Sequence, residues 1–392
     1  MHASQSNIMA HFDLDSFFVS VELLRDPSLK GKAVIVGGSP ERGIVTTCSY
    51  EARKFGVHSA MPMKTAMRLC PHAIVVKGTY ADYGRYSKWV TQIIASKAPL
   101  FEKASIDEFY IDLSGMDKFF NPLQWTIDLR NLITSETGLP ISFGIAKNKM
   151  VAKMATNEAK PNGFLQVLAG KEKDFLAPLE VNKIPGVGEQ TNQVLIYNGF
   201  KFIRDIHNTT PEKIEKLLGK WGHDLWNKAQ GIHSSTISGY HEAKSISTEN
   251  TFEENITEVN TLMMEIVRMT EKIAFELRKD EKLTGCITVK IRYPDFETTS
   301  RQVSIPYTSA DDEMIPVAKD LFHKLYKKGK PVRLLGVRLS DLSGDAVQTN
   351  LFQNTERKNV LYKAIDDVKN RFGKTSVVRA AGKLKPGKKN IM

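Results

Sequence analysis

The sequence predicts a chain of several domains that mix helices and strands, an α+β multidomain fold. Its length of 392 residues suits three to four units of roughly 100–150 residues each. Strand and helix patterns alternate through 8–166, and a β-α-β-β-α-β pattern occupies 244–339. A hydrophobic content of 41% is ample for real cores, and a charged content of 25% is ordinary for folded proteins.

The first predicted strand, residues 8–13, ends in an acidic residue, Asp13. Apolar residues then fall at helical spacing, so a helix begins near Asp15 or Ser16, both favourable N-cap residues. Asp13 therefore lies at a strand-to-helix junction, where side chains commonly converge on ligands. Alternatively, Asp13 and Asp15 serve only as helix caps.

Two further strands, 33–36 and 44–48, precede a capped helix over 49–56. Tyr50 and Arg53 are three residues apart and share one face of this helix. Near a helix start, a guanidinium and a phenol hydroxyl can hold a phosphate, although such pairs are often only solvated. Helices are also predicted over 80–98 and 125–137.

The stretch 104–113 carries two adjacent carboxylates, Asp107 and Glu108, in an alternating pattern typical of a half-buried strand. A plain strand would send one of them inward, where an unpaired carboxylate is costly. A tight turn beginning at Ser105 would instead let both reach one cation. A strand at 139–146 and a basic helix over 147–160 complete this domain.

A new unit begins near Gly170, and within it Gly186, Val187 and Gly188 form a turn before a helix. Such a turn exposes successive backbone N–H groups at the helix N-terminus. It predicts a sequence-independent grip on nucleic-acid phosphates, with a simple helix–helix turn as the alternative.

The β-α-β-β-α-β pattern that follows is rich in Lys and Arg, so its sheet or edge suits contact with a nucleic-acid backbone. Its strands are predicted at 244–251, 286–293, 299–305 and 332–339, and its helices at 259–278 and 311–328. The tail, 353–392, holds eleven Lys and Arg against three Asp and Glu. An apolar helical face near Leu361 predicts that part of it folds, and the stretch from Ala381 is expected to be disordered.

The formal net charge of +11 favours a polyanionic partner, with nucleic acid ahead of membrane. On charge alone, a merely soluble basic protein is the alternative. The three cysteines, Cys48, Cys70 and Cys286, are far apart, so we expect neither a zinc site nor disulfides, as suits a reducing cytoplasm. Apolar runs stay well short of the roughly 18 residues of a membrane span, and we expect no signal peptide.

Asp13 and the Asp107–Glu108 pair come from two strands, which is the arrangement that two-metal chemistry needs. Oxygen ligands without a His or Cys cluster favour Mg²⁺. Metal-dependent nucleotidyl transfer, phosphoryl transfer and phosphodiester hydrolysis all remain open on these residues. A non-catalytic DNA-binding scaffold and a metal-dependent nuclease are the rival functions.

Four motifs occur at 12–18 (FDLDSFF), 50–57 (YEARKFGV), 105–108 (SIDE) and 159–163 (AKPNG). In this order and spacing they resemble the motifs of the Y-family DNA polymerases, in the DNA polymerase IV branch. The resemblance covers roughly 8–345. It implies a template-directed, error-prone translesion polymerase that adds deoxynucleotides to a primer 3′-OH, in DNA damage tolerance.

The resemblance also implies roles for single residues. Asp13, Asp107 and Glu108, with the backbone carbonyl of Leu14, would hold two Mg²⁺ ions. The incoming triphosphate would be held by Tyr50, Arg53 and Lys160. Phe18 would be the steric gate against ribonucleotides and Phe17 would pack beside it, unless both only fill the core. Asp112 falls outside the motif and is interpreted as a strand-end or turn residue.

A right-hand architecture follows from the same resemblance. It comprises a palm (1–30 and 78–167), small fingers (31–77), a helical thumb with the helix-hairpin-helix turn (168–233), a linker (234–243) and a little finger (244–345). The expected partners are primer-template DNA and deoxynucleoside triphosphates, with the protein acting as a monomer.

The last segment, 346–392, contains the peptide QTNLF at 348–352. It is similar to the Gln-x-x-Leu-Phe peptides by which bacterial polymerases dock on the sliding clamp. Gln348 would donate and accept hydrogen bonds, while Leu351 and Phe352 would fill an apolar pocket. Packing at the end of the last strand is the alternative.

Overall fold

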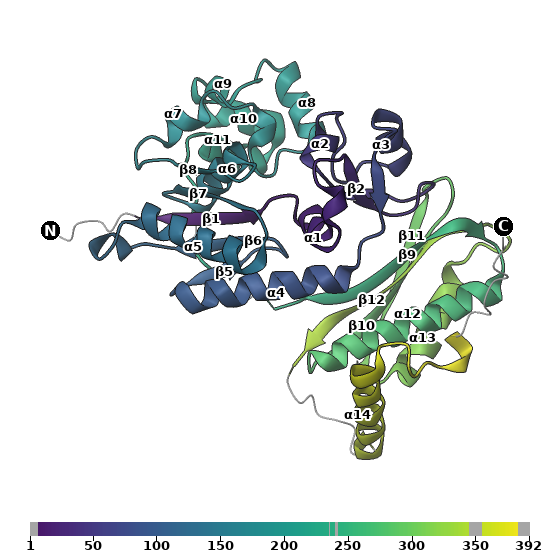
Figure 1. Ribbon diagram of the computed structural model, residues 1–392. Coiled ribbons are helices and arrows are strands. Elements are labelled where there is room, and N and C mark those ends of the chain that lie inside the picture. The colour runs from purple at the N-terminus through teal and green to yellow at the C-terminus, as the bar shows by residue number, and fades with distance from the viewer. Residues whose placement is uncertain (1–6, 235, 240–241, 345–354, 383–392) are drawn as a thin grey trace. The chain divides into compact units, whose positions relative to one another are not determined.

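The computed structural model describes residues 7–234, 236–239, 242–344 and 355–382 (Figure 1). The chain divides into two compact units, Met1–His241 and Glu242–Met392. The segments expected to form palm, fingers and thumb lie in the first unit, and the expected little finger lies in the second.

A five-stranded sheet with the order β5-β6-β1-β7-β8 forms the centre of the first unit. Its central strand, β1 (Met9–Leu14), is antiparallel to β6 (Glu108–Asp112) on one side and to β7 (Ile141–Ala146) on the other. The edges are β5 (Phe101–Lys103) and β8 (Phe164–Gln166). The strands expected at 8–13 and 139–146 are confirmed.

The two faces of this sheet are chemically different. Phe12, Phe109 and Phe143 are fully buried on one face, in a core shared with α1 (Phe17–Arg25), α4 (Tyr80–Lys97) and α5 (Pro122–Thr137). Helix α6 (Lys149–Ala159) covers the other face. Gly144 of β7 permits that contact, because a Cβ there would lie 2.3 Å from the Ala152 carbonyl oxygen. Since strand side chains alternate, every second residue of β1 points toward α6.

A smaller sheet follows α1 and the short helix η1 (Pro27–Leu29), with the order β3-β2-β4. Its strands are β2 (Val34–Gly37), β3 (Val45–Cys48) and β4 (Ile74–Val76). Helices α2 (Tyr50–Arg53) and α3 (Met63–Leu69) pack against it. The Ser49 hydroxyl caps α2 by accepting a hydrogen bond from the Ala52 N–H, as expected for this helix.

A helical layer completes the first unit. It contains α7 (Glu172–Leu176), η3 (Val181–Lys183), α8 (Glu189–Tyr197), α9 (Ile203–His207), α10 (Pro211–Leu218) and α11 (Lys220–Ala229). Its core is continuous with the apolar side of α6, through residues such as Met150 and Val151. Helix α6 thus lies between the sheet and this layer and contacts both.

The second unit has the predicted β-α-β-β-α-β order. Its sheet runs β11-β10-β12-β9, all antiparallel, with α12 (Val259–Lys279) and α13 (Asp311–Leu325) packed on one face. The strands are β9 (Ser245–Ile256), β10 (Leu283–Arg292), β11 (Thr298–Thr308) and β12 (Val332–Ser343). Strand β12 continues past the predicted end at residue 339, because its pairing with β10 runs on to Ser343.

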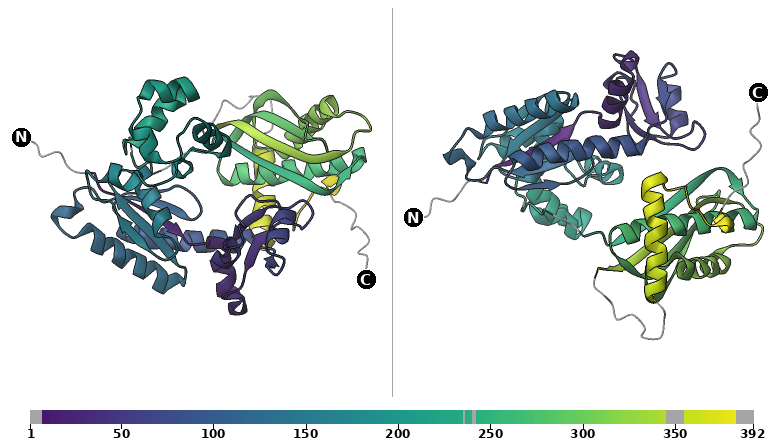
Figure 2. Two further views of the ribbon diagram at one scale, coloured as in Figure 1. Left: turned by 90° about the horizontal axis from the view of Figure 1, so that it is seen from above. Right: turned by 60° about the horizontal axis from the view of Figure 1, so that its bottom comes forward.

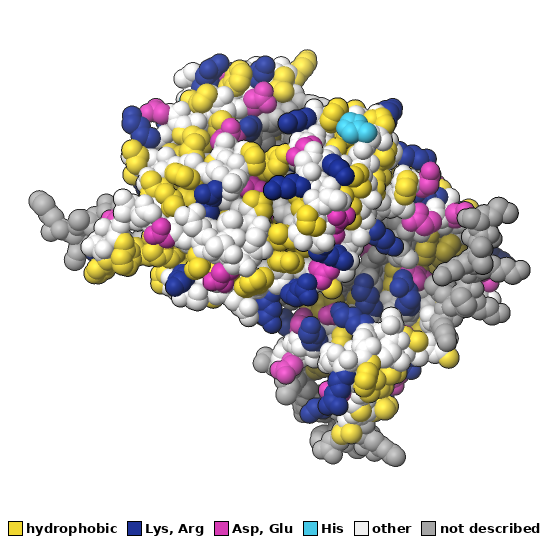
Figure 3. Space-filling view, viewed as in Figure 1, with side chains coloured by type: hydrophobic (Ala, Val, Ile, Leu, Met, Phe, Trp, Pro, Cys, Tyr) yellow, Lys and Arg dark blue, Asp and Glu magenta, His cyan; other side chains and the backbone are white. Residues whose placement is uncertain are grey.

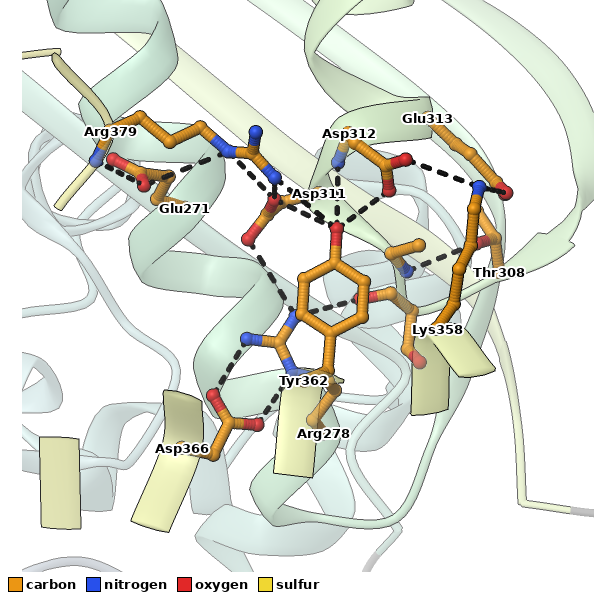
Figure 4. A network of polar contacts seen from close by, with 12 residues as sticks. Glu271, Arg278, Thr308, Asp311, Asp312, Glu313, Lys358, Tyr362, Asp366 and Arg379 are labelled. Carbon is orange, nitrogen blue, oxygen red and sulfur yellow. Dashed lines mark hydrogen bonds and ion pairs between the residues drawn. The ribbon is translucent and has the colours of Figure 1, made fainter. Parts of the chain in front are cut away.

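The tail folds over much of its length, since α14 (Thr355–Phe372) lies on the side of α12 and α13 in the second unit (Figure 2). The hydroxyl of Tyr362 donates to Asp312 Oδ1 at 2.6 Å, and Arg278 Nε donates to Asp366 Oδ2 at 2.6 Å (Figure 4). Arg379, just before η4 (Ala380–Gly382), pairs with Asp311. Ala381 therefore lies in a short helix, and the clamp peptide and residues 383–392 lie outside the described residues.

Of the two alternatives for 104–113, a plain strand and a turn beginning at Ser105, the structure has the turn, because strand β6 begins only at Glu108 after β5. One local prediction was wrong. The start of α1 is not capped by a side chain. Ser16 occupies the N-cap position with φ 43° and makes no capping hydrogen bond, and Asp15 is engaged elsewhere.

The three cysteines are all buried and unbridged. Among the helices that the structure describes, none is both long and apolar enough to cross a membrane.

Candidate active site

The acidic residues of β1 and β6 meet across the sheet. Asp13 and Glu108 are direct cross-strand partners in the antiparallel β1–β6 ladder, and both lie on the face covered by α6. The same face carries His11, opposite Tyr110, with ring centroids 4.6 Å apart. The period-2 alternation that buries Phe12 on the other side therefore collects these polar groups under α6.

The turn before β6 presents Asp107 beside them. The Ser105 hydroxyl oxygen accepts hydrogen bonds from the N–H groups of Asp107 and Glu108, at 3.3 and 3.0 Å. The same hydroxyl donates to Asp107 Oδ1 at 2.6 Å. In addition, the Leu14 N–H donates to the Asp107 carbonyl at 3.1 Å, which ties this turn to the end of β1. The predicted turn at Ser105 is confirmed.

Asp13 is almost fully buried, at 5% exposed, and its carboxylate pairs with Lys160 Nζ at 2.6 Å. Burial raises the pKa of Asp13 to about 7, against the opposing charge of Lys160 and with a further rise from Glu108 and Asp107. A carboxylate with so high a pKa binds a cation in place of a proton readily. Lys160 supplies that positive charge in this structure.

Glu108 is held by two nitrogen atoms from different elements. Lys153 Nζ of α6 lies 2.5 Å from Glu108 Oε2, and His11 Nε2 lies 3.6 Å from the same oxygen. Burial alone would raise the pKa of Glu108, but these two neighbours lower it to about 2. Burial lowers the pKa of His11, so its ring is neutral near pH 7 and Lys153 carries the compensating charge.

Lys160 is positioned by the loop that ends α6. In that loop, the Asn162 N–H donates to Asp15 Oδ2 at 2.7 Å, and Arg130 of α5 donates to the Asn162 carbonyl at 2.7 Å. Ser142 of β7 donates to both oxygens of Asp15, at 3.0 and 2.9 Å. The buried Asp15 carboxylate therefore fixes the loop to the sheet.

Asp15 also reaches the smaller sheet. The Tyr50 hydroxyl of α2 donates to Asp15 Oδ1 at 3.2 Å, and burial raises the pKa of Tyr50, so the hydroxyl keeps its proton. Arg53 lies over the Tyr50 ring at 5.0 Å and is exposed. The structure thus links Tyr50 with the Lys160 loop through one carboxylate, and it places Arg53 beside Tyr50.

Phe18 and Phe17 have different environments. Phe18 is partly buried and stacks on Tyr83 of α4, with centroids 4.0 Å apart and planes 8° apart. The Tyr83 hydroxyl donates to Glu22 Oε1 at 2.6 Å, which holds the ring in place. Phe17 is only 3% exposed and belongs to the core. It is therefore placed to support Phe18 from beneath.

The Gly186–Gly188 turn lies in the helical layer, separate from the carboxylates in the fold. Gly186 has φ 102°, a conformation that favours glycine, and Gly188 is the N-cap of α8. Both glycines are exposed, whereas Val187 packs against the core of the layer. The turn therefore exposes its backbone at Gly186 and Gly188, and the Val187 side chain holds it against the core of the helical layer.

The donor atoms of Asp13, Asp107 and Glu108 suit a divalent ion in their chemistry. Among the described residues, no three His, Cys, Asp or Glu side chains lie close enough together to hold a metal ion. Instead, Lys160 and Lys153 occupy the places of positive charge beside Asp13 and Glu108. Three carboxylates from adjoining backbone segments, with oxygen as the donor atom, fit a hard cation such as Mg²⁺. Asp112 accepts from the Ser114 N–H at the end of β6, as interpreted from sequence.

Sequence reasoning missed four residues that shape this site: His11, Asp15 in its actual role, Tyr83 and Lys153. The alternation of β1 places His11 on the face of Asp13, and this signal was available. Lys153 and Lys160 are seven apart in a stretch predicted as one helix, so a shared face was a usable signal, although in the structure α6 ends at Ala159 and Lys160 is its C-cap. The contacts of Asp15 and Tyr83 depend on tertiary packing over more than 60 residues, which no local pattern encodes.

Comparison with known proteins places the chain in a family. Residues 12–157 match the impB/mucB/samB family, and residues 243–351 match the C-terminal domain of that family. A DNA polymerase IV from Desulfatibacillum aliphaticivorans is 38% identical over 382 residues, which cover 96% of each chain. A DNA polymerase IV from Staphylococcus aureus is 35% identical over 355 residues, 90% of this chain and 97% of that protein.

Solved structures agree. A Y-family DNA polymerase chimera of Dbh and Dpo4 has a TM-score of 0.74 at 28% identity and covers 86% of this chain and 100% of its own. An insertion ternary complex of Dbh DNA polymerase has a TM-score of 0.61 at 29% identity, covering 85% of this chain and 98% of its own. The α+β polymerase fold predicted from sequence is confirmed, and the chain belongs to the Y-family DNA polymerases, in the DNA polymerase IV branch.

Proposed function

We propose that this translesion DNA polymerase extends a primer by nucleotidyl transfer at the Asp13–Asp107–Glu108 site. The observation that carries the proposal is the meeting of Asp13 and Glu108 as cross-strand partners, with Asp107 on the adjoining turn. Y-family polymerases generally use divalent metal ions, and we propose two Mg²⁺ ions held by these carboxylates and the Leu14 carbonyl. When bound, such ions neutralise phosphate charge and make the primer 3′-hydroxyl more acidic.

The chain's own residues bind and orient the substrate. The Tyr50 hydroxyl donates its one proton to Asp15 in the structure and would turn it to a triphosphate oxygen on binding, while Arg53 and Lys160 bring positive charge to the triphosphate. These charges also stabilise the pyrophosphate that leaves. The Phe18 ring, which stacks on Tyr83, is proposed as the gate whose clash with a ribose 2′-OH excludes ribonucleotides.

DNA is proposed to bind through backbone contacts on both units. In the first, the exposed Gly186–Gly188 turn offers N–H groups to a phosphate. In the second, Lys290 and Arg292 alternate with the buried Ile291 on β10, and the exposed Arg338 lies on the neighbouring β12, so they line the sheet face opposite α12 and α13. Lys and Arg side chains recur over the drawn face of both units (Figure 3).

Two further partners belong to the proposal. The Gln348, Leu351 and Phe352 peptide is proposed to bind a sliding clamp, and it follows in the chain after β12, which ends at Ser343. We propose that the protein acts as a monomer in the cytoplasm, in keeping with its unbridged cysteines.

The test is primer extension with Mg²⁺ by Glu108→Gln and Asp107→Asn, two nearly isosteric variants. Each should lower the extension rate by at least about a hundredfold, as expected for loss of a principal electrostatic contact in the transition state. Asp128→Asn, on an exposed part of α5, is the control and should extend at the native rate. Shortening of the primer instead of extension would identify a nuclease, and native extension by both variants would refute the site.

A further inference from the structure

The nitrogen nearest to Glu108 belongs to a residue that has no role in the reaction described so far. Lys153 Nζ lies 2.5 Å from Glu108 Oε2, and the two side chains are 28% and 21% exposed. The pair is therefore partly shielded from water, where opposite charges attract more strongly than at an open surface. It is also accessible enough for the ammonium group to leave without unfolding α6.

Among the described residues, Lys153 is the one Lys or Arg that forms an ion pair with Glu108. His11 faces the same carboxylate oxygen at 3.6 Å, but its Nε2 is buried without a hydrogen-bond partner among the described residues. Its Nδ1 lies 2.9 Å from the Thr156 hydroxyl, one helical turn beyond Ala152 on α6. His11 is thus held near Glu108 by Thr156, but its Nε2 forms no hydrogen bond with the Glu108 carboxylate.

We propose that Lys153 is the exchangeable counter-ion of Glu108, a positioning residue that a divalent ion must displace before the site becomes active. The inference rests on the proposed function, because it takes Glu108 as an ion ligand. With the ammonium group in place, Glu108 keeps its charge and its orientation in the resting enzyme. Once Glu108 contacts the ion, Lys153 is released from its carboxylate partner, and the triphosphate proposed to bind Lys160 is the available anion.

This arrangement makes a definite prediction about ion affinity. An ion that displaces Lys153 must break a short ion pair, so the pair weakens ion binding in the absence of substrate. Removing the charge should tighten binding by about tenfold, which corresponds to about 1.4 kcal/mol. A residue with a merely structural role would not tighten ion binding when it is replaced.

The experiment measures binding of Mn²⁺ alone, without DNA or nucleotide, from the electron paramagnetic resonance signal of the free ion. Lys153→Gln removes the charge but keeps a hydrogen-bond donor, and Lys153→Arg keeps the charge. The matched control is Lys183→Gln, because Lys183 and Glu158 form an ion pair of the same 2.5 Å length elsewhere. We expect about tenfold tighter binding for Lys153→Gln and native affinity for the other two variants.

The outcomes separate this inference from the proposed function. If Glu108→Gln loses Mn²⁺ binding but Lys153→Gln binds as the native protein does, the counter-ion role is refuted and the ion site stands. If Glu108→Gln binds Mn²⁺ natively, the assignment of the ion site itself fails. Should Lys153→Gln fail to fold by circular dichroism, Lys153→Met carries the same test, and weaker binding by either neutral variant overturns the inference.

Discussion

Replacing Asp15 by Ala tests whether one buried carboxylate holds together the residues proposed to bind the nucleotide. The substitution removes the acceptor of three donors, from Ser142, Tyr50 and Asn162. The Ser142 hydroxyl is fully buried and would be left unsatisfied, at a cost of about 1–3 kcal/mol. The other two donors are partly buried and can turn to water, so each loses about 0.5–1.5 kcal/mol. We expect the first unit to lose about 2–6 kcal/mol of stability.

The measurement is urea unfolding of the full chain, followed by the intrinsic fluorescence of the first unit. A double-mutant cycle with Tyr50→Phe should show coupling of at least about 0.5 kcal/mol, since both changes remove one shared hydrogen bond. The KM for deoxynucleotides should also rise severalfold, because Tyr50 and the Lys160 loop lose their common anchor. A loss below about 1 kcal/mol with an unchanged KM would refute the role of Asp15, and Asp128→Ala is the control on the exposed surface.

Four other outcomes are expected. Because the pKa of folded Asp13 is raised to about 7, the stability that this group contributes is present at low pH and is lost as the pH rises toward 7; Asp13→Asn should therefore flatten the stability of the ion-free protein between pH 5 and 8 in thermal melts. A native slope in that variant would exclude Asp13 as its origin. Phe18→Ala should raise ribonucleotide incorporation by at least about tenfold in single-nucleotide extension, and unchanged selection would reject the gate. Replacing Leu351 and Phe352 by Ala should abolish stimulation by a sliding clamp and spare basal extension; surviving stimulation would place the clamp contact elsewhere. Tyr362→Phe should destabilise the second unit by about 1–2 kcal/mol and speed proteolysis within α14, since its hydroxyl bonds to Asp311 and Asp312; native resistance would show that the helix is held by its ion pairs alone.

Much of the fold could be predicted from the sequence, because the main helices and strands follow local patterns. The strand before Asp13, the Ser49 cap and the β-α-β-β-α-β order are each encoded within about 20 residues, by apolar periodicity and by turn and capping residues. The arrangement of these elements into one polymerase fold was predicted from the resemblance of the four motifs to a known family. Asp13, Asp107 and Glu108 could be proposed as ion ligands from the sequence, on the single assumption that their two strands pair.

The sequence did not show which partners the charged side chains of the site and of the tail would have. Asp15 looked like a helix cap because Asp is frequent at N-caps, but tertiary hydrogen bonds to Ser142 and Asn162 outweigh the local preference. In the tail, sequence showed only an excess of Lys and Arg. The structure pairs Lys358 with Asp312 and Glu313, and Arg379 with Asp311, so part of that positive charge stabilises the second unit.

The site and the core of the first unit depend on the same strand register. Along β1, Ala10, Phe12 and Leu14 enter the core with α4 and α5, while His11 and Asp13 face α6. A slip of one residue would exchange the two sets, burying Asp13 among apolar side chains and moving Phe12 against the lysines. The cost of burying that carboxylate unpaired opposes the slip, and so does the loss of Phe12 from the core. The ion pairs with Lys160 and Lys153 therefore offset part of the cost of burying Asp13 and Glu108 and help to specify the register that brings these two carboxylates together.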